Sequence, residues 1–501
     1  MDKDVSNANQ DQPSEPTLKE KTATGLFWGG ISNLVQQVIG AGFGIAIARI
    51  LSPDDYGLIG MLLIFTAVAN TLMDSGFTVA LVNKKEIRHE DYNAVFWFSI
   101  FLGITIYIIL FFSAPLIAKF YDRPILINLS RLLFVSFLIS SMGFAHNAIL
   151  FKKLMVKERA KIDVVAVTVS GSVGLILALC GFAYRGLAIQ AVLMSGISVL
   201  LRWRYAPWKP TLHHIDLSPL KSMIGFSSKL LITNIFTQVS SQILSVILGK
   251  SYGETQVGYY SQGYKWMQLC NMVISGMMSS VAQPVFVEAN EDKDRQLQIF
   301  RKMIRFGAFV SFPAMFGLAF IGREFILIAL GEKWIESVPV LKIFCIVGGF
   351  WFLFVLYYHL LSSLGKSNII MWYSLFVASM ILATIIIVNE IDLDFLIMVI
   401  CYAVVTLLSF VGWHFLACKF IGLRLIHVLK DISFYLIITI GCLMGTQLLT
   451  KPIQNIFFLC FSKIIIFVIL YFVIMKFSPS KIFKESMGFI MRFLEKKEDY
   501  N

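Results

Sequence analysis

Charged residues are scarce in this chain. Asp, Glu, Lys and Arg together make up 15% of its 501 residues, whereas hydrophobic residues make up 57%. A soluble domain carries about 25% charged residues, and the mean hydropathy here is +0.75. The composition therefore excludes a water-exposed globular domain and predicts a polytopic membrane protein.

Catalytic and nucleotide-binding motifs are also missing. The sequence contains no P-loop, no H-E-x-x-H motif and no G-x-S-x-G motif. None of its seven cysteines forms a C-x-x-C pair or has a histidine at ligand spacing, so we expect neither a metal site nor a disulfide framework. We therefore expect a protein that is not an enzyme and uses no cofactor. Any transport would draw on an ion gradient or on the gradient of the substrate itself.

Long apolar runs take the place of such motifs. A helix needs about 20 apolar residues to cross the hydrocarbon core of a bilayer. On that rule the chain holds about fourteen transmembrane helices, and we expect an all-α polytopic fold. The expected spans cover residues 24–51, 56–81, 93–118, 125–151, 162–183, 186–203, 221–249, 255–286, 300–328, 337–364, 368–388, 394–418, 428–450 and 455–477.

Basic residues collect in alternate loops between these spans. Lys and Arg are enriched in cytoplasmic loops, so this bias predicts that both termini are cytoplasmic. It also accounts for the net charge of +12 without a nucleic-acid partner. The basic loops contain, among others, Lys84, Lys85, Arg88, Lys152, Lys153, Lys157, Arg159, Lys161, Arg202, Arg204, Lys209, Lys293, Arg295, Arg301, Lys302, Lys419, Arg424 and Lys430.

A polar pattern in the first span returns 201 positions later. Its members follow the spacing i, i+3, i+4, i+7, i+11 and so lie on one face of a helix. Six spans separate the two copies, and an even number makes the repeat parallel, with a pseudo-two-fold axis along the membrane normal. The copies are Asn33, Gln36, Gln37, Gly40 and Gly44, and Asn234, Thr237, Gln238, Ser241 and Ser245, and Gly57 and Gly258 keep the same offset.

The repeat divides the chain into two lobes. We expect six-helix lobes at residues 24–204 and 221–418, joined by a proline-containing cytoplasmic linker at 205–220. Residues 1–23 form an N-terminal cytoplasmic tail, and residues 419–477 add two spans outside the repeat. In residues 478–501, Phe483, Met487, Ile490 and Leu494 recur at helical spacing. This pattern predicts an amphipathic helix that lies on the cytoplasmic leaflet or packs against a loop.

The polar faces are suited to sugars. Asn and Gln side chains both donate and accept hydrogen bonds, which matches hydroxyl groups without net charge. The alternative is contact between helices, which amide and small residues commonly mediate in membranes; recurrence in both halves favours a cavity. The expected sugar-binding residues are Asn33, Gln36, Gln37, Asn234, Gln238, Gln242, Gln262 and Gln268.

Charged residues inside the spans are candidates for function, because charge is costly in hydrocarbon. Lys265 lies near mid-depth, shares a helix face with polar residues, and is expected to contact an anionic phosphate group. The alternative is a structural ion pair. Arg131, Lys229 and Arg49 are weaker phosphate-binding candidates, because each is near a membrane edge and could snorkel. Lys342 and Lys463 are expected to snorkel.

Asp74 is the acid that lies well inside a span, in the sequence Met73-Asp74-Ser75-Gly76. It could bind a proton or a sodium ion, or contact a sugar. It could equally fix the cytoplasmic end of its helix through a hydrogen bond or a salt bridge. Both interpretations stay open from the sequence.

Between residues 47 and 82 the sequence reads Ile47-Ala48-Arg49-Ile50-Leu51-Ser52-Pro53-Asp54-Asp55-Tyr56-Gly57, then Asp74-Ser75-Gly76-Phe77 and Ala80-Leu81-Val82. These segments resemble the opening of bacterial polysaccharide transporters, the Wzx-type flippases of the multidrug/oligosaccharidyl-lipid/polysaccharide exporter superfamily. The colanic-acid-type branch is the nearest in character. The span count and the repeat extend the resemblance over nearly the whole chain.

The resemblance implies a V-shaped pair of lobes plus two extra helices in the bacterial inner membrane. It also implies movement of undecaprenyl-pyrophosphate-linked oligosaccharides to the outer leaflet by alternating access, with basic cavity residues at the pyrophosphate and coupling to H⁺ or Na⁺. Lipid-linked oligosaccharide, membrane lipids and the polymerase and chain-length proteins of polysaccharide assembly are the expected partners.

Other functions remain open at this point. A lipid II flippase is a near alternative. A drug/cation antiporter of the same superfamily binds cations with buried carboxylates, whereas buried Lys and Arg outnumber the acid Asp74 here. A membrane-embedded polymerase or glycosyltransferase would need clustered acids or a large outer loop, and a pure scaffold would not need repeated polar faces.

Overall fold

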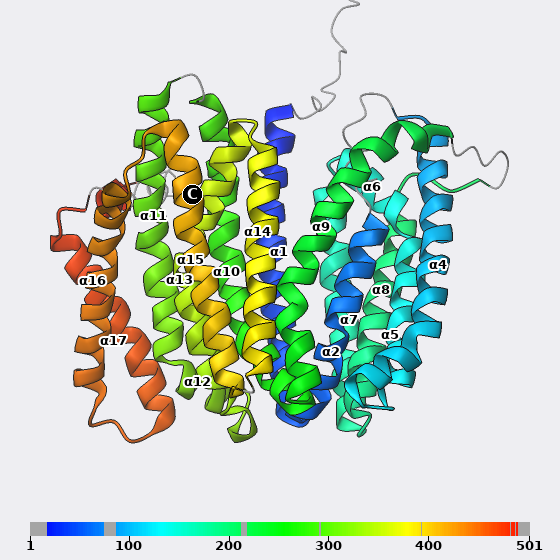
Figure 1. Cartoon of the computed structure of the whole chain (residues 1–501), viewed down its shortest axis with the longest axis horizontal. Coiled ribbons are helices and arrows are strands. Elements are labelled where there is room, and N and C mark those ends of the chain that lie inside the picture. The colour runs from blue at the N-terminus through cyan, green and yellow to red at the C-terminus, as the bar shows by residue number, and fades with distance from the viewer. Residues whose placement is uncertain are drawn as a thin grey trace, which may run out of the picture.

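The computed structural model describes residues 18–74, 87–211, 218–289, 292–391, 393–480, 482–485 and 487–488, without the side chains at 18–32, 74, 219–230, 232, 233 and 237. All regular structure in these residues is helical (Figure 1). The elements are α1 (Leu18–Ile50), α2 (Pro53–Asp74), α4 (His89–Tyr121), α5 (Leu126–Ser141), α6 (Phe144–Lys152), α7 (Val156–Leu179), α8 (Ala183–Tyr205), α9 (Ser218–Ser251), α10 (Glu254–Glu288), α11 (Lys293–Phe320), α12 (Gly322–Ala329), the 3₁₀ turn η1 (Glu332–Trp334), α13 (Ser337–Ser363), α14 (Ser367–Glu390), α15 (Phe395–Ile421), α16 (Leu425–Thr450) and α17 (Ile456–Phe477).

Twelve of the described helices are long and apolar enough to cross a membrane, and α5 with α6 makes a thirteenth span if this bent pair counts as one. α9, with 34 residues, occupies the position of the remaining expected span but is not among these. The expected all-α polytopic membrane fold is confirmed, and helix ends lie within a few residues of those expected in most spans.

Two expected spans are broken instead of continuous, which corrects the sequence interpretation. α5 and α6 meet at an angle of 47°. The N–H groups of Met142 and Gly143 bond three residues back, to Ile139 and Ser140, so the helix tightens and ends there. A Cβ at Gly143 would lie 2.9 Å from Val199 Cγ2, so the bend brings α8 close to this glycine. The other break separates α11 from α12 at Ile321.

The turn between α1 and α2 shows why its sequence starts a helix. Ser52 precedes Pro53, whose fixed φ suits the first helical position. The Asp55 carboxylate accepts from Ser52 N at 2.9 Å, while Asp55 N donates to Ser52 Oγ at 3.3 Å. This reciprocal pair is a capping box. Asp55 also accepts from Tyr184 N at 3.3 Å, which ties the start of α2 to the start of α8.

The two halves of the repeat meet through their matching glycines. A Cβ at Gly57 of α2 would lie 1.8 Å from the Glu254 carbonyl oxygen of α10. A Cβ at Gly258 of α10 would lie 2.1 Å from the Pro53 carbonyl oxygen of α2. Positions 53 and 254 are themselves equivalent in the repeat, so the two contacts exchange under a pseudo-two-fold rotation. Only glycine permits backbones to approach this closely.

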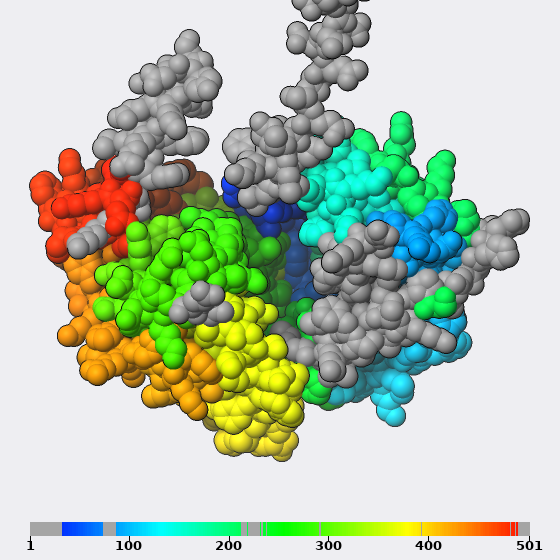
Figure 2. All heavy atoms as spheres, turned by 90° about the horizontal axis from the view of Figure 1, so that it is seen from above, coloured from blue at the N-terminus to red at the C-terminus, as the bar shows by residue number. Residues whose placement is uncertain are grey.

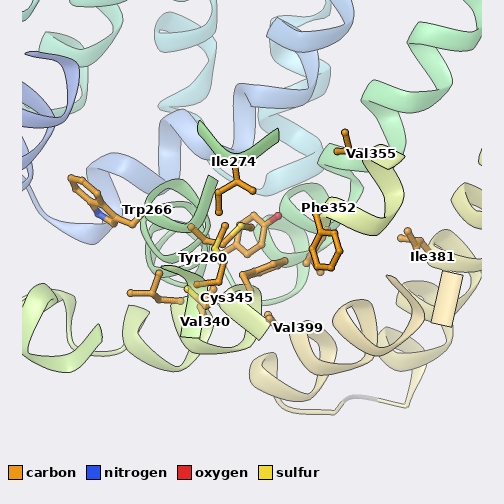
Figure 3. Close-up of a cluster of buried hydrophobic side chains, with 14 of the residues drawn as sticks. Tyr260, Trp266, Ile274, Val340, Cys345, Phe352, Val355, Ile381 and Val399 are labelled. Carbon is orange, nitrogen blue, oxygen red and sulfur yellow. The ribbon is translucent and has the colours of Figure 1, made fainter. Parts of the chain in front are cut away.

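The helices fall into two groups. In Figure 1, α2 and α4 to α8 stand on one side and α10 to α15 on the other, with α1 and α9 between them. α16 and α17 lie at the outer edge of the second group. The largest part of the buried core is in the second group, where side chains of α10, α13 and α15 interlock, among them Tyr260, Trp266, Ile274, Val340, Cys345 and Val399 (Figure 3).

Candidate functional site

The two helix groups are joined at the end where α1 turns into α2. Arg49 Nε donates to the Ala329 carbonyl at 2.8 Å, and its Nη2 donates to the Ile328 carbonyl. In return, Lys333 Nζ donates to the Arg49 carbonyl and Trp334 Nε1 to the Ala48 carbonyl, each at 2.9 Å. These bonds connect α1 to α12 and η1, at the bottom of Figure 1.

Ion pairs close the same end on the opposite flank. Arg123 pairs with Glu254 at 2.7 Å, and Lys250 pairs with Asp122 at 2.6 Å, in each case between a residue near the α4–α5 turn and one near the α9–α10 turn. The Lys250 ammonium lowers the pKa of the Asp122 carboxyl through a hydrogen bond and charge attraction. The other end of the molecule is hollowed between the two helix groups, as Figure 2 shows. This end carries the basic loops.

Lys265 lies at the contact between α10 and α1. A Cβ at Gly44 would lie 2.8 Å from Lys265 Nζ, so the ammonium group occupies the space that this glycine leaves open. The ammonium also lies 5.6 Å from the centre of the Trp266 ring. No carboxylate within the described part of the chain lies within 4.0 Å of it. Lys265 is therefore a half-buried cation at the seam between the halves, without a counterion there.

One amide of α1 reaches the same seam. Gln37 Nε2 approaches Met272 Sδ of α10 at 3.9 Å, two turns of α1 from Gly44. Gln36 is half-buried and Asn33 is exposed. Two members of the first polar pattern, Gln37 and Gly44, thus face α10, whereas a Cβ at Gly40 would lie 3.9 Å from Val167 Cγ1 of α7. Lys265 lies deeper along α1 than the amides.

The polar face of α9 borders a different space. Asn234 is exposed, Gln238 and Gln242 are half-buried, and the Ser241 hydroxyl donates to the Gln238 carbonyl at 2.9 Å. Together with Ser240, Ser241 lines a cavity of about 160 Å³ between α9 and the helices α13, α14 and α15. Its remaining polar and aromatic lining includes Trp351, Ser374, Tyr402, Thr406, Ser409 and Trp413.

Sequence reasoning missed this aromatic and hydroxyl cavity. A usable signal was present, because Tyr402, Thr406, Ser409 and Trp413 follow the spacing i, i+4, i+7, i+11 and so share one face of α15. The run around this face is otherwise apolar, so the sequence predicts only a transmembrane span at residues 394–418.

Several expected binding residues lie elsewhere. Gln262 is 1% exposed and its side chain contacts Tyr56 of α2, so no substrate in the hollow reaches it in this conformation. Gln268 is half-buried on α10. The Arg131 guanidinium lies 4.1 Å from the Phe111 ring centre and is held against α4. Arg49 belongs to the closed end described above, where its guanidinium donates to backbone carbonyl groups of α12. The side chains of Lys229 and Asp74 lie outside the described residues.

Lys463 was expected to snorkel, and this prediction is wrong. Its Nζ lies 2.7 Å from Glu324 Oε1, and both side chains are at most 8% exposed. The pair joins α17 to the short helix α12. Lys463 is two turns inside its span, and the sequence does not reveal its partner because the glutamate is 139 residues away. Lys342, by contrast, is exposed.

An apolar groove of about 560 Å³ lies beside the α1–α10 seam. α1, α10, α11, α12 and α17 form its walls, and Gln37 and Lys463 are the polar residues at its edge. The seam therefore separates two environments: an apolar groove on one side, and on the other the hollow between the helix groups.

Two pseudo-symmetric helix groups, closed at one end and hollowed at the other, define the fold of a multi-pass membrane transporter. Solved structures share it. A structure of the lipid II flippase MurJ in an inward closed conformation superposes with a TM-score of 0.71 at 13% identity, covering 89% of this chain and 97% of that one. An inward-facing multidrug MATE transporter superposes with a TM-score of 0.61 at 15% identity, covering 77% of this chain and 95% of that one.

The chain belongs to the family described as "Polysaccharide biosynthesis protein", whose model matches residues 46–339. It is 26% identical over 340 residues to the lipopolysaccharide biosynthesis protein WzxC of Escherichia coli, covering 66% of this chain and 68% of WzxC. It is 25% identical over 335 residues to the teichuronic acid biosynthesis protein TuaB of Bacillus subtilis, covering 66% of this chain and 69% of TuaB. Membership of the Wzx-type family confirms the resemblance drawn from residues 47–82.

Proposed function

We propose that this protein is a flippase that moves undecaprenyl-pyrophosphate-linked oligosaccharides across the bacterial inner membrane for surface polysaccharide assembly. O-antigen, capsule and exopolysaccharide units are the substrate class. The observation that carries this function is Lys265, a cation without a described counterion at the seam between the halves. Family membership and the named relatives supply the biosynthetic context.

The pyrophosphate is the group that Lys265 would meet. A lysine ammonium acts on phosphate as a point charge, and half-burial strengthens that attraction because the surrounding dielectric is low. A dianionic pyrophosphate would supply the counterion that Lys265 lacks. Arg131, held against α4, and Lys229 remain secondary candidates for the same role.

The sugars would occupy the hollow between the helix groups. The amides of α1 and α9 offer donors and acceptors at its edges, and the cavity behind α9 adds hydroxyl groups and tryptophan rings. Alternating hydroxyl and aromatic surfaces suit sugars, which carry hydroxyls on their rims and C–H groups on their faces. The expected sugar-contacting residues are Asn33, Gln36, Gln37, Asn234, Gln238 and Gln242, and we add Ser240, Ser241, Trp351 and Trp413.

The prenyl tail would stay in the apolar groove beside the α1–α10 seam. Its volume of about 560 Å³ and its apolar walls fit part of a hydrocarbon chain. With the basic loops and both termini assigned to the cytoplasm, the hollow opens to the cytoplasmic side, where such a substrate is assembled. Rocking of the two groups about their axis would then expose it to the other side.

An ion gradient would drive this cycle. Asp74 remains the candidate for H⁺ or Na⁺ coupling, and the polymerase and chain-length proteins of polysaccharide assembly remain candidate partners. Transport of lipid II is the second function to test, since the lipid II flippase structure has the same fold with a TM-score of 0.71.

The test is complementation of a flippase-null strain, scored by surface polysaccharide at matched protein levels. We expect K265E to abolish complementation, K265A to reduce it strongly and K265R to retain part of it. The control is K342A, because Lys342 is an exposed lysine on α13. Full complementation by K265E would remove Lys265 from the mechanism. If the protein in reconstituted vesicles moves lipid II but no other lipid-linked oligosaccharide, lipid II replaces the proposed substrate.

A further inference from the structure

A basic pocket lies outside the α1–α10 seam, at the end of the molecule that carries the basic loops. α11, α16 and the segment after α17 form its walls around about 300 Å³. Its charged lining residues are Lys302, Arg305, Lys430, Asp431 and Glu485. None of them belongs to the repeat pattern or to the closed end.

The charges in this pocket do not balance. Asp431 is satisfied by Arg301, whose Nε and Nη2 donate to its two carboxylate oxygens at 2.7 and 3.1 Å. Glu485 pairs with Lys302 at 2.5 Å. Lys430 makes no ion pair with the described residues. Arg305 lies 4.0 Å from the already paired Asp431, and its buried Nε has no hydrogen-bond partner in the described structure.

An apolar groove adjoins the pocket. It encloses about 430 Å³ between α10, α11 and the segment after α17, and it shares Lys302, Ile482 and Glu485 with the pocket. Methionine and branched side chains, such as Met277, Val281 and Met303, make its walls. Met277 and Val281 are 46% and 51% exposed, so the groove is open at the surface of the helix bundle.

We propose that the pocket and the groove together bind an anionic phospholipid, with the phosphodiester on Arg305 and Lys430 and an acyl chain along α10 and α11. Basic pockets between membrane helices at the cytoplasmic surface are suited to anionic head groups. A phosphodiester with one negative charge would act as a counterion for the Arg305 side chain, which is 40% exposed, and for the exposed Lys430. Such a lipid bridges α11, α16 and residues 479, 480, 482 and 485, so it stabilises the attachment of the last two helices.

The site can be tested on the purified full-length protein in detergent. Thermal unfolding and native mass spectrometry would be measured with phosphatidylglycerol, phosphatidylcholine, undecaprenyl pyrophosphate and inorganic phosphate as separate additions. We expect phosphatidylglycerol to bind and to raise the melting temperature, and phosphatidylcholine and inorganic phosphate to do neither. The R305Q/K430Q variant should bind phosphatidylglycerol at least ten-fold more weakly.

The control is K419Q, which removes an exposed lysine at the same end of α15 and should bind as the natural protein does. K430Q alone tests the site without disturbing packing, because Lys430 is exposed, and should weaken binding several-fold. Equal binding of phosphatidylcholine, unchanged binding by R305Q/K430Q, or the same stabilisation by inorganic phosphate would overturn the site. Displacement of phosphatidylglycerol by undecaprenyl pyrophosphate at this pocket would assign it to the transported substrate instead. None of these outcomes depends on Lys265.

Discussion

Thr255 donates its hydroxyl hydrogen bond to the carboxylate of Asp54, and these two residues occupy equivalent positions of the repeat. A contact between equivalent residues lies on the pseudo-two-fold axis. The glycine contacts at Gly57 and Gly258 flank it on either side. The segment Pro53-Asp54-Asp55-Tyr56-Gly57 is therefore the place where the two halves are joined at the closed end.

Gly57 should tolerate no side chain. A Cβ there would lie 1.8 Å from the Glu254 carbonyl oxygen, which is backbone and cannot turn away. We expect G57V to separate α2 from α10 and to lower stability by about 1–3 kcal/mol or more. Thermal unfolding in detergent measures this, and G42A is the control, since a Cβ at Gly42 meets nothing within 4 Å. A G57V protein with the same melting temperature as the natural protein would contradict the close approach of α2 to α10.

Gly44 should matter for transport more than for folding. A side chain at this position competes with the Lys265 ammonium, the far end of a flexible chain, which can move. We expect G44V to fold normally while complementation falls toward the level of K265A. Surface polysaccharide and protein abundance are measured together, again with G42A as the control on the same helix. Full activity of G44V would show that the position of the ammonium is not important.

The buried pair of Glu324 and Lys463 should be costly to break. Removing one partner leaves an uncompensated buried charge, which destabilises a protein by about 3–5 kcal/mol. We expect K463M to lower the melting temperature and K463M/E324Q to recover most of the loss. A double-mutant cycle of melting temperatures measures this coupling. If K463M and E324Q each have the melting temperature of the natural protein, the ion pair is not formed in the membrane.

Arg49 should control how firmly the closed end is held. R49Q removes donors to two carbonyl groups at the end of α12, and hydrogen bonds from charged groups contribute about 1.5–3 kcal/mol each. We expect a shift of the population toward separation of this end. Spin labels at K119C and K451C, with the exposed Cys180 replaced, would report a longer distance in R49Q. An unchanged distance distribution would mean that the ion pairs on the opposite flank hold this end alone.

Much of the fold follows from patterns that repeat along the sequence. Apolar run lengths predict the spans, and the offset of 201 residues predicts which helices are equivalent. The capping box at Ser52 and Asp55 is local, so its role can be deduced from neighbouring residues.

The pairing of distant charges cannot be deduced in this way. Glu324 and Lys463 are 139 residues apart, and only the packing of α12 on α17 brings them together. The same holds for Arg49, whose partners are carbonyl groups that no sequence pattern marks. Gln262 follows the polar spacing of its helix yet is buried, because helical periodicity gives a face but not the neighbour that covers it.

The two contacts between the halves differ in tightness. On the α2–α9 flank, Ser245 is 1% exposed and bonds to the Gly60 carbonyl at 3.1 Å, and a Cβ at Gly249 would lie 2.9 Å from both Met61 and Tyr121. On the α1–α10 flank the contacts are looser: Lys265 lies beside Gly44, and Gln37 approaches the thioether of Met272. On the proposed mechanism, sideways opening occurs at the looser flank, and the part of the hydrocarbon chain that extends beyond the apolar groove remains in the lipid. The protein then does not recognise the number of prenyl units, so carriers shorter or longer than the natural one should cross at similar rates.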